Sequence, residues 1–216
     1  MTDFTGGEWR SLVDGTVVSA IPDSGDLQAR FTVESVSANT DTWSDELGNY
    51  NLTGGTASYV DTGTDAPYLD FSGGVSMDTS WPTLSHPITF GLVVDAVDDS
   101  TNSETVLATA SGGADILIDR GDGTGYNYTF GDGFVSSNSS PSDGFETLVL
   151  VGDSANSLLE RDNTEIASGD AGNSRGTDGI AVSGGTNPMD LKIKELVVWN
   201  GTPDPGQVHD YLTRWF

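Results

Sequence analysis

The segment that decides the fold is Leu191-Lys192-Ile193-Lys194-Glu195-Leu196-Val197-Val198-Trp199-Asn200, near the end of the 216-residue chain. From Leu196 to Trp199 it is an uninterrupted apolar run of mostly β-branched and aromatic side chains, and Asn200 follows as a turn residue. A short run of this composition that ends at a turn residue predicts a buried β-strand.

A short helix is predicted after this strand. Asp204 suits the N-cap, Pro205 suits the first helical position, and Gln207 completes a capping box. The apolar side chains that then recur at helical spacing are those of Val208, Tyr211, Leu212 and Trp215. We therefore expect one apolar face of this helix to pack on the strands.

The rest of the chain shows short segments rich in β-branched and aromatic residues, separated by Gly, Asn, Asp and Pro. This pattern is typical of an all-β sandwich. The predicted strands are residues 29–33, 57–60, 68–71, 88–96, 105–110, 115–119, 126–130, 147–152, 156–161, 180–182 and 191–199. Turn signals such as Gly54-Gly55 and Asp122-Gly123 lie between them.

Five stretches together resemble the laminin-G-like branch of the concanavalin A-like lectin/glucanase superfamily. They are residues 43–54, which open on Trp43 and contain Gly48-Asn49, residues 68–74 with Phe71-Ser72-Gly73, and residues 87–94, 144–151 and 191–200. The resemblance covers about residues 26–216. It implies an all-β, two-sheet antiparallel jelly-roll sandwich (concanavalin A-like) with a short C-terminal helix.

One hairpin departs from the pattern of that superfamily. Residues 158–166 lack its usual aromatic–Val–Asp/Asn–Gly turn and have Asp162-Asn163 at the tip instead. Asp and Asn both tolerate positive φ, so we expect the hairpin to form.

The charge is strongly acidic, with 33 Asp and Glu against 8 Lys and Arg and a net charge of −25. The acids are spread along the chain, lysine occurs only as Lys192 and Lys194, and a core pattern persists, so we expect a protein adapted to high salt. Phosphate would be repelled, which argues against nucleic acid as a partner. No apolar run approaches the length of a membrane span, so we expect no membrane insertion.

Residues 1–25 are predicted to form an N-terminal arm that docks on other proteins, and residues 26–216 the sandwich. The alternative for the arm is an extra edge strand on the same core. The first residues have neither the basic region nor the apolar region of a signal peptide, so we expect synthesis in the cytoplasm without an export signal.

No sequence pattern predicts catalysis. The glucanase relatives carry Glu-x-Asp-x-x-Glu on one strand, and that pattern is absent here. Gly172-Asn173-Ser174-Arg175-Gly176 has the spelling of a nucleophile elbow, but a strand and not a helix is expected after it. His86 and His209 belong to no metal-binding motif. We therefore expect a protein that is not an enzyme and has no catalytic residues.

Calcium is the one cofactor for which the sequence offers ligands. Asp119, Asp122 and Asp132 lie in or beside Gly-rich loops, where carboxylates and carbonyls suit a hard cation. The spacing is not that of an EF-hand, and the alternative is a set of solvated turns.

Glycan binding needs a planar aromatic side chain beside hydrogen-bonding groups. Asp119, Tyr126, Asn127 and Tyr128 provide both within one segment, and Trp81 is a second candidate because the following Pro82 indicates a loop. The alternative is a strand whose alternating Tyr126 and Tyr128 pack on neighbouring strands.

The resemblance and the acidic composition together favour a virion surface protein of a haloarchaeal tailed virus, in a head turret, a decoration or a tail. It would form a homo-oligomer, dock on other virion proteins through its arm, and bind a host surface glycan or glycoprotein. Two alternatives are a purely structural decoration protein and a protein related to glycoside hydrolases.

Overall fold

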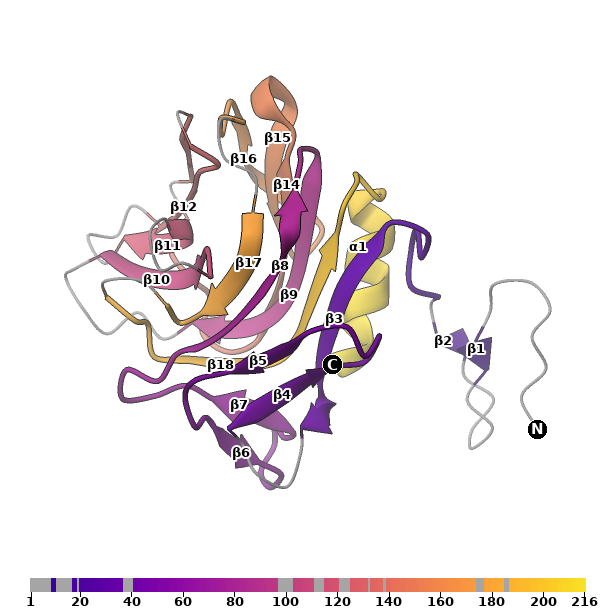
Figure 1. Ribbon diagram of the computed structural model, residues 1–216, viewed down its shortest axis with the longest axis vertical. Coiled ribbons are helices and arrows are strands. Elements are labelled where there is room, and N and C mark those ends of the chain that lie inside the picture. Colours follow the sequence, from indigo (N-terminus) through magenta and orange to yellow (C-terminus); the bar gives the residue numbers. More distant parts are fainter. Residues whose placement is uncertain are drawn as a thin grey trace.

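The computed structural model describes residues 9–10, 17–18, 20–36, 41–96, 103–110, 115–120, 125–131, 133–137, 139–173, 177–184 and 187–216. They form an all-β molecule with one short α-helix near the C-terminus (Figure 1). The predicted fold class, a two-sheet antiparallel sandwich with a C-terminal helix, is confirmed. No helix in this described part has the length and apolar character that a membrane crossing requires.

The elements are β1 (Trp9–Arg10), β2 (Val17–Val18), β3 (Leu27–Val36), β4 (Thr42–Asp45), β5 (Asn51–Thr53), β6 (Ser58–Val60), β7 (Tyr68–Asp70), β8 (Met77–Leu84), β9 (Ile88–Ala96), β10 (Ser103–Ala108), β11 (Asp115–Arg120), β12 (Gly125–Tyr128), β13 (Val135–Ser136), β14 (Glu146–Gly152), β15 (Ser157–Arg161), β16 (Thr164–Gly169), β17 (Thr177–Val182), β18 (Leu191–Trp199) and α1 (Pro205–Leu212). Two single 3₁₀ turns, η1 (Ser154–Asn156) and η2 (Thr213–Trp215), complete them.

Apart from β1 and β2, the strands belong to one hydrogen-bonded sheet that folds into two layers. The helix-bearing sheet has the order β3-β18-β9-β14-β15-β16, with β7 also on β18 and β6 on β7. The opposite sheet has the order β4-β5-β8-β17-β10-β11-β12-β13. The two sheets join where β3 pairs with β4 through Phe31↔Asp45 and Val36↔Trp43, with an irregularity in register between these pairs.

The predicted strand over residues 191–199 is confirmed as β18, at the centre of the helix-bearing sheet between β3 and β9. Its side chains serve two separate cores. Ile193, Leu196 and Val198 face the space between the sheets, whereas Val197 and Trp199 lie under the helix. A strand buried on both faces needs the near-continuous apolar run that the sequence shows.

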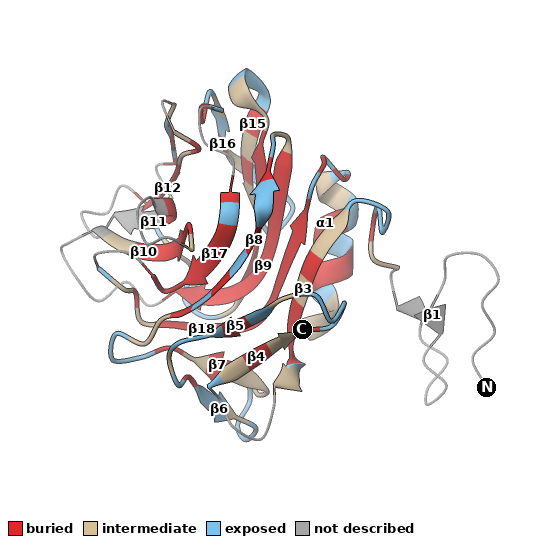
Figure 2. Cartoon of the chain, in the orientation of Figure 1, coloured by how far each residue is buried: buried red, intermediate tan, exposed pale blue. Residues whose placement is uncertain are grey.

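Helix α1 begins as predicted. The Asp204 side chain accepts a hydrogen bond from the Gln207 backbone N–H at 3.0 Å, and Pro205 is the first helical residue. Val208, Tyr211 and Leu212 are buried against the outer face of β9, β14 and β18 (Figure 2). The helix therefore covers one side of the sandwich.

The core between the sheets is built on aromatic side chains. Trp43 has no exposed surface, donates its indole N–H to the Thr32 carbonyl at 2.6 Å, and packs on Phe31 and Phe71. The stretch after Trp43 forms a turn around Asp45, whose carboxylate accepts backbone N–H bonds from Arg30, Leu47, Asn49 and Tyr50. These four bonds fix the turn between β4 and β5 against the start of β3.

Helix α1 lies close to the sheet because residue 91 of β9 is a glycine. A Cβ built there would lie 3.1 Å from Val208 Cγ1, 3.2 Å from Trp199 Cζ3 and 3.3 Å from Leu212 Cδ1. A larger side chain at this position must displace the helix.

Gly91→Leu should lower the free energy of unfolding by about 1–3 kcal/mol, as overpacked cores do. Denaturant unfolding in molar salt measures the change. Gly25→Leu is the matched control, because a Cβ at Gly25 has no atom within 4 Å, and it should change stability by about 0.5 kcal/mol at most. Equal losses in the two variants would contradict the close packing of the helix.

Most of the predicted N-terminal arm lies outside the described residues. Its strands β1 and β2 pair with each other in an antiparallel ladder, Trp9↔Val18 and Arg10↔Val17, separate from the sandwich path. The boundary at residue 25 and the docking role of the arm stay predictions.

Candidate functional site

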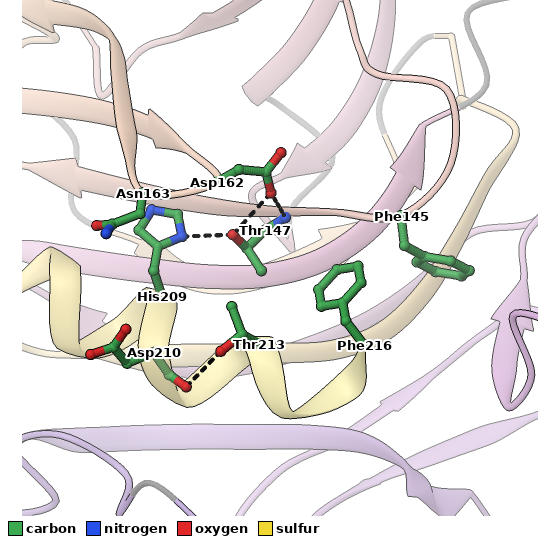
Figure 3. A pocket seen from close by; sticks show the side chains of 8 residues that line it. All are labelled: Phe145, Thr147, Asp162, Asn163, His209, Asp210, Thr213 and Phe216. Carbon is green, nitrogen blue, oxygen red and sulfur yellow. Dashed lines mark hydrogen bonds between the residues drawn. The ribbon is translucent and has the colours of Figure 1, made fainter.

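A shallow pocket of about 440 Å³ lies between the C-terminal helix and the sheet. Its lining residues are Phe145, Thr147, Asp162, Asn163, His209, Asp210, Thr213 and Phe216 (Figure 3). The volume is within the range of sites for small ligands. Three segments form the walls: the start of β14, the turn between β15 and β16, and the α1–η2 segment, which is far from the other two in sequence.

The β15–β16 turn supplies Asp162 and Asn163. Both have positive φ, 48° and 61°, which these residue types tolerate better than most. The predicted Asp-Asn hairpin turn is therefore confirmed, and it places two polar side chains at the rim of the pocket (Figure 3).

Thr147 connects the turn to the helix. Its backbone N–H and its hydroxyl lie 2.9 and 3.3 Å from Asp162 Oδ1, and its Oγ1 lies 2.6 Å from His209 Nδ1. Thr147 and His209 are each only 1% exposed. Because these bonds join the strand, the turn and the helix, they hold the walls of the pocket in fixed relative positions.

On its far side, His209 faces Glu160. His209 Nε2 lies 3.3 Å from Glu160 Oε2, and neither atom makes a hydrogen bond within the described part of the chain. Burial lowers the pKa of His209. Burial also raises the pKa of Glu160, and the negative charges of the nearby Glu165 and Asp204 raise it further. At neutral pH His209 therefore adds no full positive charge to the pocket.

The pocket contains polar groups with no internal partner. The Asp210 carboxylate, the Asn163 amide and the second carboxylate oxygen of Asp162 receive or donate no hydrogen bond among the described residues. Asp162, Asn163 and Asp210 are exposed. These groups are available to a ligand.

Two phenylalanine rings form the opposite end of the pocket. Phe216 is 66% exposed, and Phe145 packs on Tyr68 with ring centroids 5.7 Å apart. The Lys194 ammonium lies 4.3 Å from the Phe145 ring centroid and 5.9 Å from that of Phe216, and donates to the Trp215 carbonyl at 3.3 Å. Burial lowers the pKa of Lys194.

Glu195 anchors the C-terminal wall of the pocket. Its carboxylate has no exposed surface and accepts hydrogen bonds from Tyr211 Oη at 2.7 Å, Trp215 Nε1 at 2.6 Å and Arg30 Nε at 3.1 Å. Arg214 forms a further ion pair with it. These bonds tie α1 and η2 to β18 and β3, so the position of Phe216 depends on them.

The structure places the predicted glycan-binding aromatics in the interior. Tyr126, Asn127 and Tyr128 have no exposed surface, and the Tyr126 hydroxyl donates to Glu146 at 2.6 Å. The alternative interpretation, packing on neighbouring strands, describes these rings correctly. In this structure their faces are covered and offer no platform to a sugar.

Trp81 is likewise buried, at 5% exposure, and the prediction of an exposed loop there is wrong. It lies within β8, where its indole donates to Thr177 Oγ1 at 3.0 Å. The following Pro82 is tolerated because the β8–β17 ladder has a register shift between its Leu84 and Ser80 pairs.

The predicted calcium ligands fall largely outside the described residues. Asp122 and Asp132 lie there, and of Asp119 the structure describes the backbone in β11. Within the described residues no group of three or more His, Asp or Glu could hold a metal ion. Calcium binding at Asp119, Asp122 and Asp132 stays a prediction, as does a glycan contact of Asp119.

No protein-family model and no curated protein sequence matches this chain. Solved structures of the same fold include Trypanosoma rangeli sialidase, with a TM-score of 0.69 and 16% identity over 95% of this chain and 35% of that one. The same sialidase in complex with sialic acid gives a TM-score of 0.66 at 16% identity, and the match covers 93% of this chain and 34% of the sialidase. The binding domain of botulinum neurotoxin DC, in complex with rat synaptotagmin II, gives a TM-score of 0.62 at 9% identity, and the match covers 89% of this chain and 52% of that domain.

These similarities show the fold, a β-sandwich shared with sialidases and with a toxin binding domain. The chain spans about a third of the length of the sialidases and about half of the toxin domain. The prediction that the protein is not an enzyme is contradicted, because the similar structures include sialidases, which are enzymes. Missing sequence motifs were too weak a reason to exclude catalysis for this fold.

Proposed function

We propose that this protein recognises carbohydrate in the pocket between α1 and the β15–β16 turn. The observation that carries the proposal is the pairing of two phenylalanine rings, Phe145 and Phe216, with the open polar groups of Asp162, Asn163 and Asp210. A sugar presents an apolar C–H face and a rim of hydroxyl groups, and this pocket offers a partner for each.

Rigidity of the site supports the proposal. Asp162 is oriented by two bonds from Thr147, and the helix is fixed by the buried Glu195 carboxylate. Binding costs less conformational entropy when the protein side chains that contact the ligand are already held in place. Sialidases and a toxin binding domain, whose named ligands include sialic acid and a protein receptor, share the same sandwich.

The setting that we propose is the surface of a virion from a salt-rich habitat, where the protein binds host glycans. Its support is the net charge of −25 and the similarity to a toxin binding domain in complex with synaptotagmin II. Several copies in a homo-oligomer would raise the avidity of a weak site by about 10²–10⁴. Copurification with particles, together with light scattering of the purified protein, tests the setting and the oligomer.

The pocket is tested by a glycan array in molar salt, followed by calorimetry with the best ligand. Phe216→Ala should weaken binding about three- to tenfold, since an aromatic contact contributes about 0.5–1.5 kcal/mol. Asn163→Gly should also weaken binding while keeping the turn, because glycine accepts positive φ.

Phe134→Ala is the matched control, since Phe134 is another exposed phenylalanine, at 50%, outside the pocket. It should leave affinity unchanged. A blank array, or equal losses in Phe134→Ala and Phe216→Ala, would overturn the proposal.

A second candidate function is cleavage of a glycosidic bond at the same pocket. It is favoured by two carboxyl groups, Asp162 and Asp210, that line one pocket, and by the sialidases among the similar structures. Glycoside hydrolysis commonly uses a pair of such groups. Release of reducing sugar from an array-positive glycan, abolished by Asp210→Asn, would establish it, whereas an intact glycan after prolonged incubation would rule it out.

A further inference from the structure

We propose that the pocket accepts a sugar that is uncharged or carries an ammonium group, and rejects a carboxylated sugar. This inference rests on the proposed function, because it assumes that sugar binds there. The charge that a ligand can carry in this pocket depends on which charged side chains around it already have partners within the chain.

The available groups of the pocket are mainly hydrogen-bond acceptors. Asp210 offers a whole carboxylate and Asp162 one oxygen, whereas Asn163 is the one open side chain there that both donates and accepts. Ligand hydroxyl and ammonium groups donate to such acceptors, but a ligand carboxylate has no proton to offer. It would meet two like charges instead.

Among the residues that the structure describes, no cation near the pocket is available to balance a ligand carboxylate. Arg214 is bound to Glu195 and to the Tyr211 carbonyl, and Arg161 to the Ser140 carbonyl near Glu146. Both guanidinium groups are therefore occupied by partners within the chain.

Lys194 is the closest candidate for a positive subsite, yet it is only 5% exposed. Its ammonium is held by the Trp215 carbonyl and by the two phenylalanine rings. Among the described lysines and arginines it is the one without a carboxylate in ion-pair range. Bringing it to a ligand would require its removal from the Phe145 ring.

His209 supplies no positive charge to balance a ligand carboxylate. It is 1% exposed, it lines the pocket, and its Nε2 has no hydrogen-bond partner among the described residues. The group facing Nε2 is the Glu160 carboxylate at 3.3 Å. Burial lowers the pKa of His209, so at neutral pH this wall holds no imidazolium that would balance a ligand carboxylate.

The test uses methyl glycosides of glucose, glucosamine and glucuronic acid, and the matching galactose series. Within each series, the amino sugar differs from the neutral sugar by one ammonium group, and the uronic acid differs from it by one carboxylate. Affinities are measured by calorimetry at the lowest salt concentration that leaves the far-ultraviolet circular dichroism unchanged, because molar salt screens charge within about 3 Å. The carboxylated sugar should bind about three- to tenfold more weakly than the amino sugar, as expected for one or two partly exposed charge contacts.

Asp210→Asn should reduce this ratio about two- to threefold, because it removes one of the two carboxylates. Asp178→Asn is the control, since Asp178 is an exposed acid of β17 outside the pocket, and it should leave the ratio unchanged. Equal or tighter binding of the carboxylated sugar, or equal effects of the two variants, would overturn the inference and leave the proposed function intact. Failure of all six glycosides together with a blank array would instead remove the proposed function and this inference with it.

Discussion

Replacing Glu195 with alanine should lower the free energy of unfolding by about 3–5 kcal/mol, the typical cost of removing one partner of a buried charged network. Arg30, Tyr211, Arg214 and Trp215 would all lose an acceptor at once. Denaturant unfolding in molar salt, followed by tryptophan fluorescence, measures the loss.

The same variant should weaken ligand binding, because the α1–η2 wall depends on Glu195. Glu34→Ala is the control: Glu34 is an exposed acid on β3, and its removal should change stability by about 0.5 kcal/mol at most. Tyr211→Phe deletes one hydroxyl donor to the Glu195 carboxylate and should cost about 1.5–3 kcal/mol, the usual contribution of a hydrogen bond to a charged group. If Glu195→Ala proved as mild as Glu34→Ala, the carboxylate would not be the anchor of the helix.

Transfer from molar to about 10 mM salt should lower the midpoint of thermal unfolding by about 10 °C or more, equivalent to a few kcal/mol for a chain of this size. With a net charge of −25, repulsion acts over about 30 Å at that ionic strength but over about 3 Å at 1 M. Thermal scans by circular dichroism over a salt series measure the shift.

A variant that neutralises exposed acids separates charge repulsion from other effects of salt. Asp61, Asp143 and Asp178 are all exposed, and their joint replacement with asparagine should lower the salt concentration needed for a given midpoint. A midpoint independent of salt, or a neutralised variant with the salt dependence of the parent chain, would contradict adaptation to high salt.

Local sequence signals predicted much of the fold because each acts over a few residues. The run from Leu196 to Trp199 is uninterrupted apolar sequence, which predicts a buried strand, and it lies within β18. The Asp204 cap and Pro205 fix the start of α1, and the Asp162-Asn163 pair fixes a tight turn. The strand, the helix start and the turn depend on side-chain branching, on one side-chain-to-backbone hydrogen bond and on backbone φ, respectively.

The exposure of the predicted glycan-binding aromatics was mispredicted because exposure depends on what packs on each face. Tyr126 and Tyr128 alternate with Asn127 in the sequence, yet all three are buried. The Tyr126 hydroxyl finds its partner in Glu146, 20 residues away, and Trp81 finds its partner in Thr177. No local pattern reveals a partner so distant, so an aromatic beside a polar residue looks the same in a core and in a binding site.

By itself, the sequence determined the all-β class, the central strand, the capped helix, the Asp-Asn turn and the acidic character of the protein. The tertiary structure alone decided that the start of β14, that turn and the end of the chain meet in one pocket, with Asp162, Asp210 and Phe216 around it. Strand and helix formation follow from short-range preferences, whereas a pocket requires the docking of α1 on the sheet. That docking is set by the glycine at residue 91 and by the carboxylate of Glu195, and both act only after distant segments have packed together.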